Sequence, residues 1–216
     1  MRVVEKFVSI NGEGRKAGEL AVFIRFQLCN LNCSYCDTKW ANTASAVYEE
    51  LSPQEIVDYV VKTGVKNATL TGGEPLLQEE LLYLTQLLGE NNISVEIETN
   101  GSVDISPFKN VKYPPSITLD YKSPSSNMED KMLMSNYEYI DEGDTVKFVV
   151  GSREDLEKAK EISEKYISKS KIYFSPIFNS IEPEEIVKFM IDNNLNNVRL
   201  QLQLHKFIWE PDRKGV

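Results

Sequence analysis

The stretch 21–38 reads AVFIRFQLCNLNCSYCDT and decides how the chain is interpreted. Its first eight residues are mostly apolar, aromatic or β-branched, and they predict a strand. Cys29, Cys33 and Cys36 follow directly, and the chain of 216 residues has no other cysteine. An odd number of clustered cysteines argues against a disulfide framework and indicates a metal or redox site. The stretch therefore predicts a strand that delivers three thiols to one edge of a sheet.

The spacing Cys-x3-Cys-x2-Cys favours an iron–sulfur cluster. Thiolates are the usual ligands of such clusters, and three of them leave one iron of a 4Fe–4S cluster open to a substrate or cofactor. A structural zinc site is the first alternative, with His205, the only histidine, as its fourth ligand. The second Cys-x2-Cys pair of zinc motifs is absent, however. Three buried small hydrophobes that are neighbours by chance are the other alternative.

Short apolar or β-branched runs alternate with helical patterns along the chain. The helical patterns begin at Ser52, Ser152 and Glu182, and a fourth covers 76–88. This alternation predicts an α/β fold with a mainly parallel sheet. The predicted strands are 21–28, 68–70, 93–98, 117–119, 145–150, 171–174 and 197–202.

Six or seven strands are few for a closed eight-stranded barrel. We therefore expect a partial, open parallel β/α barrel that forms a single domain over residues 1–216. A flavodoxin-like or Rossmann sheet is the alternative, but no Gly-x-Gly-x-x-Gly follows a predicted strand.

Polar residues follow most of the predicted strands, which is where parallel barrels place their functional groups. Turn chemistry explains some of the Gly, Asn, Asp and Ser residues there, but it does not require Cys, Lys and His. The segments are Thr71–Pro75, Thr99–Gly101, Asp120–Ser123, Ser175–Pro176 and Gln203–His205, with Lys147 inside the fifth strand.

Charge and hydropathy exclude several partners. The net charge is −9 and no cluster of Lys and Arg stands out, which argues against a nucleic-acid partner. The first residues contain no apolar segment of the signal-peptide kind, and the apolar runs are too short for a membrane span. We expect a cytoplasmic protein without a membrane partner.

Two motifs resemble the radical S-adenosylmethionine superfamily. One is the cysteine motif with Tyr35 directly before its last cysteine, and the other is Thr71-Gly72-Gly73-Glu74-Pro75 after the second predicted strand. The resemblance implies an open-barrel fold of the radical-SAM type. It also implies that the open iron binds S-adenosylmethionine, whose reductive cleavage gives a 5′-deoxyadenosyl radical. The protein then positions the reactants, excludes water and tunes the cluster potential.

Two further segments, Ser9–Gly14 and the tail 203–216, resemble the 7-carboxy-7-deazaguanine synthase family. With them, the resemblance to that family covers nearly the whole chain. That family converts 6-carboxy-5,6,7,8-tetrahydropterin to 7-carboxy-7-deazaguanine with loss of ammonia, in queuosine and 7-deazapurine biosynthesis. The resemblance implies a pterin substrate, Mg²⁺, a flavodoxin or ferredoxin-type electron donor and a homodimer. The tail is expected to close the mouth of the active site.

The resemblance also implies residue roles. Cys29, Cys33 and Cys36 hold the cluster, and Thr38 binds Mg²⁺. The substrate-binding positions are Ile10, Asn11, Gly12, Glu13, Arg25, Thr71, His205 and the terminal carboxylate of Val216. The S-adenosylmethionine positions are Tyr35, Gly73, Glu74, Thr99, Asn100, Asp120, Tyr121, Lys122, Lys147, Ser175, Pro176, Ile177 and Phe178.

Several of these residues have a plainer interpretation. Asn11 stands where the family often has Gln. Arg25 fits an outward-facing strand position as well as a carboxylate-binding fork. His205 fits a satisfied buried histidine, and Tyr35 a loop aromatic. At the level of function, the alternatives are a glycyl-radical enzyme activase, which acts on a protein, and a non-catalytic iron–sulfur or zinc module.

Overall fold

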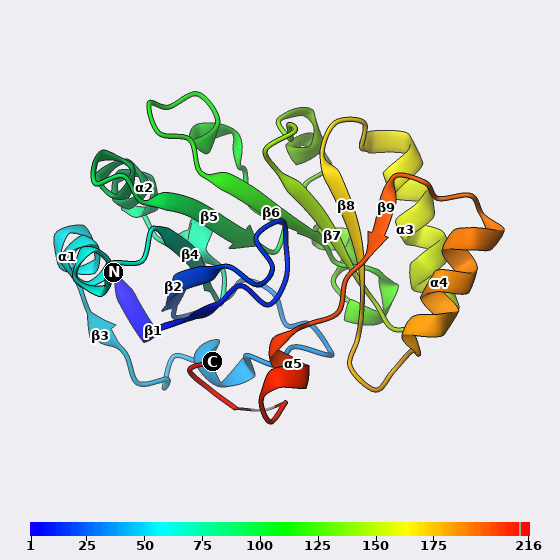
Figure 1. Ribbon diagram of the computed structural model, residues 1–216, viewed down its shortest axis with the longest axis horizontal. Helices are drawn as coiled ribbons and strands as arrows, with labels where there is room; N and C mark the ends of the chain where they lie inside the picture. The colour runs from blue at the N-terminus through cyan, green and yellow to red at the C-terminus, as the bar shows by residue number, and fades with distance from the viewer. Residues whose placement is uncertain (212) are drawn as a thin grey trace.

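In the computed structural model, which describes residues 1–211 and 213–216, nine strands form one open sheet (Figure 1). Their order across the sheet is β3-β1-β2-β4-β5-β6-β7-β8-β9. The strands are β1 (Arg2–Ile10), β2 (Leu20–Phe26), β3 (Glu49–Glu50), β4 (Asn67–Gly72), β5 (Ser94–Thr99), β6 (Ser116–Tyr121), β7 (Thr145–Val150), β8 (Lys171–Pro176) and β9 (Val198–Leu200). The helices are α1 (Pro53–Thr63), α2 (Leu81–Glu90), α3 (Arg153–Tyr166), α4 (Pro183–Asp192) and α5 (His205–Ile208).

All seven strands expected from the sequence are present, and β2 and β4 to β9 pair in parallel in chain order. The prediction of an open, mainly parallel barrel is confirmed. The sequence did not reveal β1 and β3, which pair antiparallel at the other edge. β1 carries Glu5 and Lys6 at its centre, and most of its residues are half-exposed, so it lacks the apolar run of a buried strand.

The four expected helices also form. α1 begins with a capping box, in which the Ser52 side chain accepts from the Glu55 N–H and the Glu55 carboxylate accepts from the Ser52 N–H. The helix predicted over 76–88 is shorter than expected, because α2 begins only at Leu81. Before it, Glu74 caps a 3₁₀ turn over Pro75–Leu77, and the extended backbone of Gln78 interrupts the helical path.

Side chains alternate across the sheet and give it an apolar face and a polar face. Ile97, Leu119 and Phe148 are fully buried on the face that packs against the helices. Their neighbours Glu98, Asp120 and Lys147 point into the barrel interior and line a cavity there. This alternation explains how buried strands can carry charged residues toward the barrel interior while their other face packs in the apolar layer.

The part of the chain that the structure describes holds no helix with the length and apolar character needed to cross a membrane.

Candidate active site

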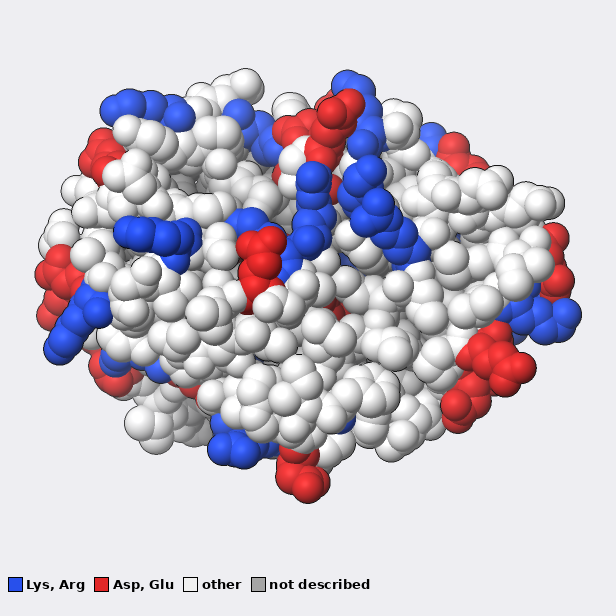
Figure 2. Space-filling view, viewed as in Figure 1, with Lys and Arg blue, Asp and Glu red and all other residues white. Residues whose placement is uncertain are grey.

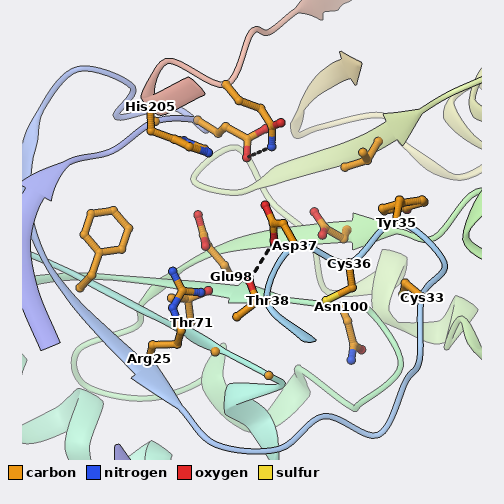
Figure 3. A pocket seen from close by; sticks show the side chains of 18 of the residues that line it. Arg25, Cys33, Tyr35, Cys36, Asp37, Thr38, Thr71, Glu98, Asn100 and His205 are labelled. Carbon is orange, nitrogen blue, oxygen red and sulfur yellow. Dashed lines mark hydrogen bonds between the residues drawn. The ribbon is translucent and has the colours of Figure 1, made fainter. Parts of the chain in front are cut away.

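A cavity of about 670 Å³ opens at the carboxyl ends of the parallel strands (Figure 3). It is called the carboxyl-end cavity below. It is lined by the three cysteines and by most of the residues predicted above: Ile10, Gly12, Glu13, Arg25, Tyr35, Thr38, Thr71, Gly73, Thr99, Asn100, Asp120, Lys122, Lys147, Ile177, Phe178, His205 and Val216.

The cysteines lie in the loop after β2, and each faces this cavity. The sulfur of Cys29 accepts from the backbone N–H of Leu31 at 3.4 Å and from the amide of Asn100 at 3.5 Å. The sulfur of Cys36 accepts from the amide of Asn42 at 3.6 Å. Burial raises the pKa of the Cys29 and Cys33 thiols, and N–H donors aimed at sulfur suit thiolates that bind a metal.

The described residues do not converge on a site for a single metal ion. Among residues 1–211 and 213–216, no three His, Cys, Asp or Glu side chains converge closely enough to hold one ion. A tetrahedral zinc site needs such convergence, whereas a 4Fe–4S cluster spreads its thiolates over several irons. The structure therefore gives no support to a zinc site completed by His205.

Gly73 stands where the end of β4 passes very close to the end of β2. Its N–H donates to the carbonyl of Phe26 at 3.1 Å, and a Cβ added to Gly73 would lie 1.6 Å from the carbonyl oxygen of Leu28. No side chain fits at this position. The close approach holds the segment of Gly73 beside the cysteine loop.

Glu74 lies behind the cavity rather than in its lining. Its fully buried carboxylate accepts from the Thr99 hydroxyl at 2.7 Å, the Asn100 N–H at 2.7 Å and the Leu76 N–H at 3.1 Å. Burial raises the pKa of Glu74 to about 7, despite these donors. The structure thus places Glu74 where it fixes Asn100, and Asn100 in turn contacts Cys29.

Lys147 joins the two sides of the cavity. Its ammonium lies 3.4 Å from a carboxylate oxygen of Glu13 and 3.3 Å from one of Asp120, which also pairs with Lys122 at 2.6 Å. Burial by itself would lower the pKa of Lys147, but the carboxylates of Asp120, Glu13 and Glu98 raise it well above its usual value. Lys147 is therefore a buried cation that holds residues of the predicted substrate and cofactor sides together.

Arg25 faces the cavity, so the outward-facing interpretation is wrong. Its Nε donates to Glu5 at 3.1 Å, and β2 pairs with β4 so that Arg25 lies beside Thr71. Figure 3 shows His205 on another wall of the same cavity. A Cβ on Gly12 would lie 2.4 Å from Nδ1 of His205, so the imidazole packs directly on the glycine backbone. Burial lowers the pKa of His205, which favours the neutral imidazole.

Thr38 and Asp37 form a pair of hard oxygen donors beside the cysteine loop. The Thr38 hydroxyl donates to the Asp37 carboxylate at 2.8 Å. Burial acts to raise the pKa of Asp37, but this hydrogen bond and the charges of Lys206 and Arg25 outweigh it and lower the pKa. An ionised carboxylate beside a hydroxyl is the kind of group that Mg²⁺ prefers.

Five predicted residues lie outside the cavity lining: Asn11, Glu74, Tyr121, Ser175 and Pro176. Tyr121 lies on the apolar face of the sheet, because its neighbour Asp120 faces the cavity and side chains alternate. Its hydroxyl donates to Glu129 at 2.8 Å, so its side chain cannot contact a ligand in the cavity. The Ser175 hydroxyl is 2.9 Å from the Glu13 carboxylate and acts only behind it. Asn11 accepts from the Thr69 hydroxyl at 2.8 Å.

The sequence reasoning missed Glu98 and Glu5, which also line the cavity. Burial raises the pKa of Glu98, and Lys147 opposes that effect. The run Ser94–Thr99 did contain a signal, because its two glutamates alternate with Val95 and Ile97 and so mark a polar inner face. Glu5 lies on β1, the strand that the sequence did not reveal.

The sequence and fold match known proteins. Residues 23–143 match the sequence model of the Radical SAM superfamily. A 7-carboxy-7-deazaguanine synthase from Clostridium acetobutylicum is 55% identical over 218 residues, which cover 100% of this chain and 99% of that protein. A protein of the same name from Methanospirillum hungatei is 37% identical and covers 98% of this chain and 86% of its own length.

Two solved structures share the fold. The crystal structure of QueE from Escherichia coli superposes with a TM-score of 0.75 at 24% identity, covering 94% of this chain and 93% of that one. Streptococcus suis SuiB, solved with bound S-adenosylmethionine, gives a TM-score of 0.59 at 13% identity, covering 82% of this chain and 48% of that one.

Proposed function

The chain belongs to the radical S-adenosylmethionine superfamily and, within it, to the 7-carboxy-7-deazaguanine synthase family, and from this premise we propose how its carboxyl-end cavity works. The reaction is the ring contraction of 6-carboxy-5,6,7,8-tetrahydropterin to 7-carboxy-7-deazaguanine with loss of ammonia. The observation that carries the proposal is that one cavity brings the three thiols together with Arg25 and His205.

The cofactor side of the cavity is the wall around the cysteine loop. When bound, the 4Fe–4S cluster and S-adenosylmethionine supply a 5′-deoxyadenosyl radical that abstracts hydrogen. Cys29, Cys33 and Cys36 would hold the cluster, and Asn100 donates to the sulfur of Cys29. The backbone at Gly73, which has room for no side chain, would accept the methionine part of the cofactor.

The substrate side lies opposite, between β1, β2 and the tail. Arg25 uses only its Nε among the described residues, so the rest of its guanidinium is available to a substrate carboxylate. Glu13 and Glu98 would accept from the N–H donors of the pterin ring. His205, held neutral by burial, can accept or donate one hydrogen bond at the ring. Tail residues such as Gln203 and Lys214 line the cavity and would exclude water.

Mg²⁺ would be held by the Thr38 hydroxyl together with the neighbouring Asp37 carboxylate. The lowered pKa of Asp37 supports this, because the carboxylate is ionised at neutral pH. Such a cation, close to Arg25, would help to neutralise a substrate carboxylate.

The electron donor, the compartment and the oligomeric state are further parts of the proposal. Each cleavage of S-adenosylmethionine consumes one electron, for which we assign a flavodoxin or ferredoxin-type donor. Three free thiols that bind a cluster need a reducing compartment, which favours the cytoplasm. Phe207 and Ile208 of α5 are 65% and 52% exposed, and covering them in a homodimer would remove apolar surface from water.

The test is an anaerobic turnover assay on reconstituted, reduced protein. We expect 5′-deoxyadenosine and 7-carboxy-7-deazaguanine when S-adenosylmethionine, 6-carboxytetrahydropterin and Mg²⁺ are all present. Omitting the pterin controls for cleavage of S-adenosylmethionine that is not coupled to substrate conversion. Omitting Mg²⁺ measures how much of the turnover depends on the metal ion. Formation of 5′-deoxyadenosine without 7-carboxy-7-deazaguanine would overturn the assignment of 6-carboxytetrahydropterin as the substrate. Turnover without any added protein substrate would exclude a glycyl-radical activase.

A further inference from the structure

The open side of the barrel lies between β9 and the β1–β2 loop, residues 11–19 (Figure 1). β9 is the last strand in the order across the sheet, and within the described chain no further strand pairs with its outer side. Two contacts nevertheless span this gap. The backbone N–H of Leu204 donates to the carbonyl of Gly12 at 3.1 Å, and the side chain of Gln201 reaches the backbone of Gly14.

Gln201 joins two parts of the sheet that are not neighbours in it. Its backbone N–H donates to the carbonyl of Phe174 on β8 at 2.9 Å, so its main chain continues the parallel sheet just beyond β9. Its side-chain amide donates to the Gly14 carbonyl at 3.0 Å and accepts from the Gly14 N–H at 2.8 Å. Gln201 is 8% exposed, so both hydrogen bonds are largely shielded from water. The side chain therefore takes the place of a backbone pair between two strands.

The β1–β2 loop depends on polar contacts, because its single apolar side chain, Ala17, is exposed. Figure 2 shows Lys, Arg and carboxylate side chains over the middle of the face on which Figure 1 draws this loop. Arg15 and Lys16 make polar contacts at the outer part of the loop. Gly14, at the inner part, has a φ of +77°, which favours glycine, and its backbone presents both its N–H and its carbonyl to Gln201.

Glu13 lies between the two glycines that these contacts hold. Its carboxylate lines the carboxyl-end cavity and accepts from the Lys147 ammonium at 3.4 Å and from the Gln203 amide at 3.3 Å. The Ser175 hydroxyl lies 2.9 Å from the same carboxylate and 3.0 Å from the carbonyl of Gln201. These donors orient the carboxylate only while the backbone on both sides of Glu13 stays in place.

We propose that Gln201 is a positioning residue for the pterin substrate, because its amide fixes the backbone of the β1–β2 loop and thereby the carboxylate of Glu13. The inference rests on the proposed function, in which Glu13 accepts from N–H donors of the pterin ring. A hydrogen bond to a carboxylate depends steeply on distance and direction, so a loop that moves loses substrate affinity although Glu13 itself is unchanged. Gln201 does not line the carboxyl-end cavity and acts only through the loop.

The experiment compares two glutamines that make the same kind of contact. Gln86 on α2 pairs with the backbone of Tyr113 through the same two hydrogen bonds, at 3.0 and 3.1 Å, and does not line the carboxyl-end cavity. Each change to leucine leaves one backbone N–H and one carbonyl without a partner. Gln201→Leu and Gln86→Leu should therefore lose similar stability in urea unfolding, which makes Gln86→Leu the matched control.

The first readout is calorimetric titration of 6-carboxytetrahydropterin into the anaerobic, reconstituted protein with S-adenosylmethionine bound and the cluster left unreduced, so that no turnover occurs. We expect Gln201→Leu to weaken pterin binding about tenfold, the effect of losing one charge-assisted hydrogen bond, and Gln86→Leu to leave it unchanged. The affinity for S-adenosylmethionine should stay within about twofold in both variants. In the reduced protein, Gln201→Leu should raise the KM for the pterin and leave kcat within about twofold.

Two results would overturn the proposal: equal pterin affinities of Gln201→Leu and Gln86→Leu, or equal losses of pterin and S-adenosylmethionine affinity in Gln201→Leu. Ser175→Ala is a smaller change at the same junction and should weaken pterin binding about threefold. If Gln201→Leu does not fold, unchanged pterin affinity in Ser175→Ala overturns the proposal instead. A wild-type protein that does not bind the pterin would overturn the proposed substrate as well, whereas binding by the wild type with equal variants removes only the role of Gln201.

Discussion

Glu98 and Glu96 stand two residues apart on the same face of β5, yet they serve opposite ends of the barrel. Glu98 lines the carboxyl-end cavity, and Lys147 opposes the rise of its pKa. Glu96 lines a second cavity, of about 840 Å³, where β5, β6 and β7 begin, and Thr118 is its hydrogen-bond partner there. Burial is the main cause of the raised pKa of both carboxyls. The difference lies in the neighbours, because Glu98 faces the buried Lys147 and shares its cavity with the three cysteines, whereas Glu96 does not.

The largest expected difference between the two ends of the barrel comes from a change in the cysteine loop. Cys33→Ser removes a buried thiol that we assign to the cluster, and we expect loss of the cluster and of all turnover. The measurement is iron and sulfide per chain together with 5′-deoxyadenosine formation. Ser34→Ala, which changes the exposed neighbouring side chain, should keep both. A Cys33→Ser protein that retains a full cluster would contradict the assignment.

Lys147→Met tests whether the buried cation matters to the carboxyl end. The change leaves Glu13 and Asp120 without a partner they now share, and an uncompensated buried charge costs about 3 kcal/mol. We expect the free energy of unfolding to fall by about that amount and turnover to fall with it, as measured by urea unfolding and product formation. Lys160→Met, on the outer surface of α3, is the matched control. Lys147→Arg should recover part of the loss.

Gly73→Ala tests how closely the backbone is packed beside the carboxyl-end cavity. The new Cβ would collide with the carbonyl oxygen of Leu28, so the backbone must shift, at a cost of about 2 kcal/mol. Binding of S-adenosylmethionine, followed by calorimetry on the reconstituted protein, should weaken more than stability alone explains. Gly143→Ala would meet only a flexible Asp141 oxygen and is the control. Equal affinities for the two variants would remove Gly73 from the cofactor site.

Glu96→Gln gives the smallest effect and sharpens the comparison at the amino end. The folded protein raises the pKa of Glu96 to about 6, from the usual 4.5. The folded state therefore holds more protons than the unfolded state between these values, and stability falls as pH rises from 4.5 to 6. The change is at most about 2 kcal/mol and is constant above that range. In urea unfolding at several pH values, Glu96→Gln should lack this part of the pH dependence, whereas turnover should remain.

Much of the fold could be predicted because short segments of the sequence carry the signals for its strands and helices. Seven of the strands are recognisable as apolar runs, and the N-cap residues Ser52 and Ser152 indicate where α1 and α3 begin. β1, which pairs with both β3 and β2, could not be found this way, because its half-exposed residues form no uniform apolar run. The late start of α2 depended on the buried carboxylate of Glu74, which caps the turn before it.

The sequence by itself determined the clustering of the three thiols, the alternation of strands and helices, and the edge at which polar residues gather, because spacing and periodicity are local properties. Only the tertiary structure decided which polar residues meet. Alternation turned Tyr121 away from the cavity and turned Arg25 and Glu98 into it. Packing brought Glu13, 134 positions away from Lys147, to its ammonium. Such contacts depend on sheet register and on burial, which no short segment of sequence encodes.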